Sequence, residues 1–336
     1  MVSFALKGAV IDYPQIEARA KCLSHAGLPL CLELHTFGHR DLYDSERRKA
    51  CLSNLTRLEE EFGNADLTVH IPFQDVDTVT SELFDARQVA DTLEFAQQCG
   101  SGRIVMHRYW GMMHGDTPPR SSRAEATAGF NETIRELSLL APEVALLVEN
   151  MGHYFLASRK PDDYLAGPLD HFFPWEIAEF SAYLDTHEIT NVFPFVDVAH
   201  ATLTSNLFNY RRQLPSGTDL PAYFSGITND DLDRASNLHP FDFVDEAMPW
   251  LHISDSRLTH CAADQNIPQE ALTCEGLEIG VGNLPFSELP ERLAGGASDT
   301  VLLLEVEPGD GETYVDNGAQ YRSLERLRRY FSLQNS

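Results

Sequence analysis

Short apolar runs alternate with longer amphipathic segments along the whole chain, and this alternation limits the folds that it can adopt. The segments between the runs carry apolar residues at helical spacing, and the last of them, from Tyr321, follows the final run. Continuous apolar runs are typical of parallel strands that are buried on both faces. The runs begin at Phe4, Leu28, Asp66, Arg103, Val144, Val192, Met248 and Thr300. This order predicts an α/β fold, a (β/α)8 TIM barrel formed by a single domain over residues 1–336.

Two of the predicted connections are much longer than the rest. They extend from Ala201 to Ala247 after the sixth strand, and from Leu258 to about Leu284 after the seventh. Because loops after the carboxyl ends of barrel strands lie on the active-site face, both are expected to form walls or lids of a pocket. The first has helical fragments and Pro/Gly breaks but no core pattern of its own. It is therefore predicted to be an insertion at 201–247.

The charge balance restricts the partners that this chain can bind. It has 25 Lys and Arg against 51 Asp and Glu, a net charge of −26. Such a surface repels phosphate backbones and anionic membranes, so neither nucleic acid nor a membrane is an expected partner. The sequence shows no signal-peptide pattern, no membrane-length apolar run and no CxxC pair among its cysteines. These features predict a cytoplasmic protein with reduced thiols.

Polar residues of the kinds that bind metals end six of the eight runs. A lone histidine in a strand is usually a hydrogen-bonded core residue. Six such ends on one face are different, because burying unpaired charges there would be costly without a function. The pattern therefore predicts a site for a divalent metal. Its candidates are His70, His107, Glu149, Asp197 with His200, His252 with Asp255, and Glu305.

The ordered motifs VHIPF, VMHRYW, VENMG, VDVAHA, LHISDS and LLEVE resemble those of the xylose isomerase-like TIM-barrel superfamily over nearly the whole chain. That superfamily includes sugar phosphate isomerase/epimerases, ketohexose 3-epimerases, inosose dehydratases and endonuclease IV. The epimerase branch implies one divalent cofactor, Mn, Mg, Co or Zn, and a small carbohydrate substrate, either a sugar or a sugar phosphate. Its metal ligands would be Glu149, Asp197, His252 and Glu305. Barrels of this kind often pair, so a homo-oligomer is one expected form.

The same resemblance implies an isomerase or epimerase that works through an ene-diolate. The metal would polarise a carbonyl group, while Glu149 and Glu305 would act as catalytic base and acid. Arg257 would donate to substrate oxygens, or else form a surface salt bridge with Asp255 or a loop acid. The residues expected to bind substrate are His200, Arg257, His107 and Trp110.

Two other functions stay open. In the endonuclease branch, His70 and His107 match ligands of a second metal and His200 matches one ligand of a third zinc, which would make the chain a zinc phosphodiesterase. That branch also has an Asp-x-His pair before the turn that resembles GLEIGVGNLPF, and this chain has LTCEGLE there instead. A barrel that binds a metabolite without catalysis is the other alternative. Glu33, inside the second strand, would either assist the pocket or pair with a buried arginine.

Overall fold

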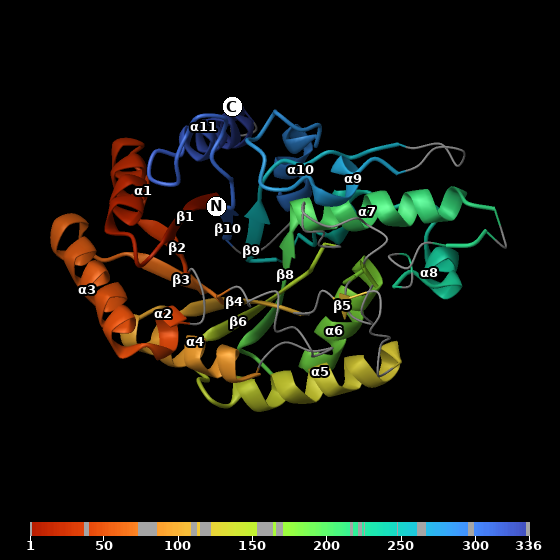
Figure 1. The fold of residues 1–336 in the computed structure, drawn as a ribbon, viewed down its shortest axis with the longest axis horizontal. Helices are drawn as coiled ribbons and strands as arrows, with labels where there is room; N and C mark the ends of the chain where they lie inside the picture. Colours follow the sequence, from red (N-terminus) through yellow and green to blue (C-terminus); the bar gives the residue numbers. More distant parts are fainter. Residues whose placement is uncertain are drawn as a thin grey trace.

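Eight parallel strands close into a barrel with helices around it (Figure 1). The computed structural model describes residues 2–36, 40–72, 86–108, 113–114, 122–152, 164–165, 171–215, 218–220, 224, 226–246, 248–260, 267–294 and 299–333. The ring has the order β1-β10-β9-β8-β6-β4-β3-β2. Each predicted run overlaps one of its strands, so the (β/α)8 prediction is confirmed. The strands are β1 (Val2–Ala9), β2 (Cys31–His35), β3 (Asp66–His70), β4 (Arg103–His107), β6 (Ala145–Glu149), β8 (Val192–Asp197), β9 (Trp250–Ile253) and β10 (Thr300–Leu304).

Helices connect the strands and begin at residues that suit helix starts. Asp44 accepts hydrogen bonds from two amides of the first turn of α3, and Ser122 forms a capping box with Glu125 at α5. The described α-helices are α1 (Tyr13–His25), α2 (Arg40–Tyr43), α3 (Ser45–Phe62), α4 (Ala86–Cys99), α5 (Arg123–Ser138), α6 (Pro174–Thr186), α7 (Val198–Gln213), α8 (Asn229–Arg234), α9 (Glu270–Thr273), α10 (Leu289–Leu293) and α11 (Gly318–Leu333). The short 3-10 helices are η4 (Pro240–Phe243) and η5 (Phe286–Glu288), and β5 (Met113–His114) pairs antiparallel with β7 (Tyr164–Leu165). Among the described residues, no helix is both long and apolar enough to cross a membrane.

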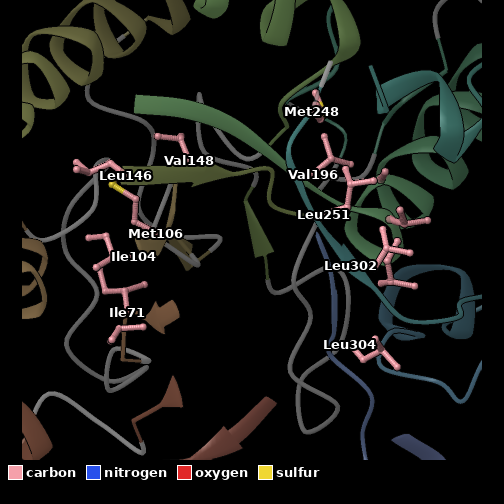
Figure 2. Close-up of a cluster of buried hydrophobic side chains, with 14 of the residues drawn as sticks. Ile71, Ile104, Met106, Leu146, Val148, Val196, Met248, Leu251, Leu302 and Leu304 are labelled. Atoms are coloured by element: carbon pink, nitrogen blue, oxygen red, sulfur yellow. The ribbon is translucent and has the colours of Figure 1, made fainter. Parts of the chain in front are cut away.

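Side chains along each barrel strand alternate between two apolar environments. One set faces the surrounding helices and belongs to the main core, as shown by Met106, Val148 and Leu302 in Figure 2. The other set comes from six strands around the ring and forms a separate cluster, which can meet only inside the barrel. It consists of Ala5, Cys31, Val105, Leu147, Phe195 and Leu303. The polar residues of the site pack against this inner layer.

The segment from Ala201 to Ala247 differs from its sequence-based description. Helix α7 begins directly after β8, and its residues from Val198 to Tyr210 are buried. Phe208 and Phe241 belong to the main core, so this segment follows a pattern of burial in the barrel core and not a core pattern of its own. Small polar residues had hidden that pattern: Asn206, for example, is buried and donates to the carbonyls of Arg257 and Ala271. The insertion itself stays a prediction.

Candidate metal centre

A ring of polar side chains lies directly above the inner apolar layer. Side chains two positions apart on a strand point to the same face, so the residue two positions after each inner apolar residue also points into the barrel. This rule places six polar residues around a common space at the carboxyl ends, where barrel active sites lie, and His70 and His252 join them through their contacts with Glu149. Most of these side chains are fully buried, and Lys7 and Glu305 are partly exposed. The ring consists of Lys7, Glu33, His70, His107, Glu149, Asp197, His252 and Glu305.

The imidazole of His252 lies at the centre of this ring. Its Nδ1 is 2.8 Å from Oε1 of Glu149, 2.9 Å from Oε2 of Glu305 and 3.9 Å from Oδ2 of Asp197. A single ring nitrogen carries at most one proton, which cannot satisfy three carboxylates. Ligand atoms of the four residues all lie within 4.8 Å of one another. Three carboxylates and one imidazole around one point are a donor set that fits a divalent cation.

Glu33 determines which nitrogen of His252 faces the carboxylate group. Its Oε2 lies 2.5 Å from Nε2 of His252. An ionised carboxylate only accepts hydrogen bonds, so Nε2 donates its proton to Glu33 and Nδ1 is left as the candidate metal ligand. Burial lowers the pKa of His252, but Glu33, Glu149 and Glu305 outweigh it and raise that pKa well above the usual value. Metal binding at Nδ1 would therefore release a proton.

Replacing Glu33 by glutamine is expected to weaken Mn²⁺ binding by about 10–100-fold, the range found when a carboxylate behind a metal-ligating histidine is lost. The amide keeps the size of the side chain but removes the charge that orients and polarises His252. Titration calorimetry of the metal-free protein measures the effect. Glu59→Gln, the same change on the exposed face of α3, serves as the matched control. Equal affinities of the two variants would contradict this role for Glu33.

His70, His107 and Glu149 form a second group of candidate ligands. Oε2 of Glu149 lies 3.1 Å from Nε2 of His107 and 3.5 Å from Nε2 of His70. Nδ1 of His70 is 2.7 Å from the carbonyl oxygen of Ile71, which can only accept, so Nδ1 carries the proton. Nε2 of His70 is therefore the nitrogen that faces Glu149 and the one that a metal would bind. Glu149 is shared by the two groups, with Oε1 directed to one and Oε2 to the other.

The environment keeps Glu149 ionised despite its complete burial. Burial raises its pKa, but His252, His107 and His70 outweigh this effect and hold the pKa well below the usual range. Asp197 shows the opposite balance, because burial raises its pKa to about 6. The Oδ1 atom of Asp197 caps helix α7 by accepting from the His200 amide at 2.6 Å. Its second oxygen, Oδ2, is the one that faces His252.

His200 lies beside this centre and has a partner that sequence reasoning missed. Its Nδ1 is 2.9 Å from the carbonyl oxygen of Asn150 and therefore donates to it, while its Nε2 is 3.2 Å from Oε2 of Glu275. Burial lowers the pKa of His200, but Asp197 and Glu275 outweigh it and raise that pKa well above the usual value. Glu275 immediately precedes Gly276, whose φ of +70° makes the turn that brings this loop back toward the barrel. The glycine after the glutamate was the available sequence signal.

The other predicted site residues have different positions. The guanidinium of Arg257 lies 3.4 Å from Glu270 in an exposed pair, which matches the salt bridge with a loop acid; its substrate contact stays a prediction. Asp255 accepts from the amides of Ser256, Gly280, Gly282 and Leu284 and so organises the loop after β9. Trp110 lies outside the described residues. Lys7, which sequence reasoning did not select, forms an ion pair with Glu305.

The fold and the polar ring together define a class: a (β/α)8 barrel with buried carboxylates and histidines at the carboxyl ends of its strands. No family model and no curated protein matches the sequence. Among solved structures, a D-tagatose 3-epimerase-like protein is similar, with a TM-score of 0.54, 17% identity, and 99% of this chain and 98% of that chain covered.

A xylose isomerase domain protein from Alicyclobacillus acidocaldarius has a TM-score of 0.55 and 14% identity, with 100% of each chain covered. A D-allulose 3-epimerase from Methylomonas sp. in complex with D-allulose has a TM-score of 0.57 and 12% identity, with 98% of this chain and 97% of that chain covered. At these identities the likeness establishes a common fold over the full length of the chains. The resemblance to xylose isomerase-like barrels is thus confirmed for the fold.

Proposed function

We propose that this protein is a divalent-metal-dependent isomerase or epimerase of a small carbohydrate. The observation that carries the proposal is the group formed by Glu149, Asp197, His252 and Glu305, whose ligand atoms lie within 4.8 Å of one another. Structural neighbours that are named as sugar 3-epimerases support the same choice. Mn, Mg, Co and Zn all suit a site of carboxylates with one imidazole.

When bound there, a divalent ion would act as a Lewis acid that polarises a substrate carbonyl and favours loss of the neighbouring C–H proton. Glu149 and Glu305 are the candidate proton acceptors. Burial raises the pKa of Glu305, but Lys7 and His252 outweigh it and hold that pKa well below the usual range. Each carboxylate can therefore take a proton from carbon, and can act as an acid only with the proton it has just taken. His200, which lies beside Glu149, is the candidate to hold a substrate oxygen.

Metal content and proton exchange test this proposal. We expect about one Mn, Mg, Co or Zn per chain by elemental analysis of protein purified without chelator. We also expect solvent deuterium to enter a C–H bond of one ketose of a panel during turnover in D₂O, because the proton removed by a carboxylate exchanges with solvent. A matched sample treated with chelator should lose the activity and regain it with metal. A metal-loaded protein that neither converts nor exchanges any sugar would contradict the proposal.

A two-metal hydrolase of phosphodiesters is the second candidate, and the group of His70, His107 and Glu149 favours it. About two metals per chain with hydrolysis of a model phosphodiester would support it. The net charge of −26 weighs against nucleic acid as that substrate. A barrel that only binds a metabolite is less favoured, because Glu149 and Glu305 both reach the same atom of His252, at 2.8 and 2.9 Å. A cytoplasmic location, a homo-oligomer and a single domain stay predictions.

A further inference from the structure

Lys7 is a largely but not fully buried cation within the ring of carboxylates. It lies on β1 in register with Glu33 of β2, and its side chain is 14% exposed. Its ammonium pairs with Oε1 of Glu305 and lies 3.8 Å from Oε1 of Glu33. Glu305 is a candidate metal ligand, and Glu33 holds the candidate ligand His252. Lys7 therefore lies next to both a candidate metal ligand and the residue that orients another candidate ligand.

We propose that Lys7 is a positioning residue that acts as a permanent cation of the metal centre. It binds Oε1 of Glu305, so that only Oε2 of that carboxylate faces the metal position. It also offsets one negative charge, which limits how tightly the centre holds a divalent ion. This inference rests on the proposed metal site and assigns to the centre a charged group that is not a ligand.

The orientation of Glu305 supports the proposal that Lys7 leaves only one oxygen of this carboxylate for the metal. Its two oxygens have different partners: Oε1 is held by Lys7, while Oε2 lies 2.9 Å from Nδ1 of His252. A carboxylate with one oxygen held by an ammonium can offer only the other oxygen to a metal, whereas a released carboxylate can bind with both. Loss of Lys7 would therefore allow Glu305 to add a second ligand atom.

The charge balance supports the proposal that Lys7 limits the affinity of the centre for a divalent ion. Four carboxylates converge here, namely those of Glu33, Glu149, Asp197 and Glu305, and each is at least three-quarters buried. One divalent ion with neutral His252 would offset two of the four charges, and Lys7 offsets a third. Because its ammonium contacts a candidate ligand and is largely shielded from solvent, it also repels the metal. Removing it should thus tighten metal binding, while a lysine that serves only the packing of β1 would have no such effect.

The test compares Lys7→Met with Lys7→Arg, which keeps the charge, and with Lys21→Met. Lys21 lies on α1 with its side chain 53% exposed and pairs with Glu17, so its loss is the same charge change far from the centre. Competition with a fluorescent chelator at fixed pH and ionic strength measures the affinity for Mn²⁺. We expect Lys7→Met to bind Mn²⁺ about tenfold more tightly or better than the unaltered protein. The other two variants should remain within about threefold of it, because the charge is retained in one and lies in solvent in the other.

The Co²⁺ forms provide an independent readout. A second oxygen from Glu305 raises the coordination number, so the visible absorption of Co²⁺ should weaken in Lys7→Met and stay unchanged in Lys7→Arg. If Lys7→Met does not fold, Lys7→Gln carries the same expectation for Mn²⁺ affinity. Unchanged or weaker binding by the folded neutral variant would overturn the inference while leaving the proposed function intact. Failure of the unaltered protein to bind any divalent ion would overturn both.

Discussion

Glu149→Gln is expected to lower turnover by about 10³-fold or more, an effect typical of removing a residue on which a whole catalytic group depends. Glu149 belongs both to the candidate ligand group with Asp197 and to the one with His107, and both of its oxygens face histidine nitrogens. An amide has the same shape as a carboxylate, but only its oxygen accepts hydrogen bonds. Its NH₂ group would lie where the carboxylate faces a metal ion or a proton donor. Turnover of the sugar identified by the deuterium screen and metal content per chain are the two measurements.

Glu305→Gln is expected to behave in the same way, since the proposed chemistry uses both carboxylates. The control is again Glu59→Gln, which changes the same atoms on the surface of α3. Circular dichroism should show that all three variants keep the fold, because an amide fits the volume of a carboxylate. Full activity in a protein with both changes, Glu149→Gln and Glu305→Gln, would remove the mechanism proposed here.

Gly282→Ala is expected to lower the free energy of unfolding by about 2–4 kcal/mol, through overpacking and the loss of buried hydrogen bonds. A Cβ at this position would collide with the carbonyl oxygen of Ser256 and with the carboxylate of Asp255. That carboxylate accepts four backbone amides and holds the loop after β9 against the barrel. The Ser256 carbonyl in turn accepts from the Asn283 amide, so neither the carbonyl nor the carboxylate can move without breaking hydrogen bonds. Urea denaturation measures the change.

Gly102→Ala is the matched control, because it is the same substitution with nothing within 4 Å of the added Cβ and no positive φ. It should change stability by less than about 0.5 kcal/mol, as most surface substitutions do. A similar loss of stability in both variants would show that the close approach at Gly282 does not determine the result.

The barrel could be predicted because each of its strands is marked by a simple pattern in the local sequence. Each of them is buried on both faces, so runs such as VALLV and VLLL are apolar throughout and separate cleanly from the helical segments. The strand ends were less predictable. The run from Leu28 becomes a strand only at Cys31, after Pro29, which has no amide proton to give to a neighbouring strand. The burial of α7 was hidden because its polar residues are satisfied by backbone groups distant in sequence.

The candidate site was only partly predictable for a similar reason. His70, Glu149 and Asp197 end their strands, where a change from apolar to polar residues is visible in the sequence. Lys7 lies within its strand, and only the alternation of inward and outward side chains from Ala5 onward would have identified it. Glu275 reaches His200 through the path of a long loop, for which Gly276 was the only local signal found in the sequence.

The pairing of β1 with β10 has a consequence for the order in which this protein can assemble. Lys7 and Glu305 are separated by 298 residues, and their strands form the seam that closes the ring. During translation Lys7 can meet Glu33 of the neighbouring strand β2 early, but it can pair with Glu305 only after β10 has left the ribosome. Such long-range pairing slows folding, because the loop entropy is lost before the contact forms. We therefore expect closure of the ring and formation of the Lys7–Glu305 pair to occur together.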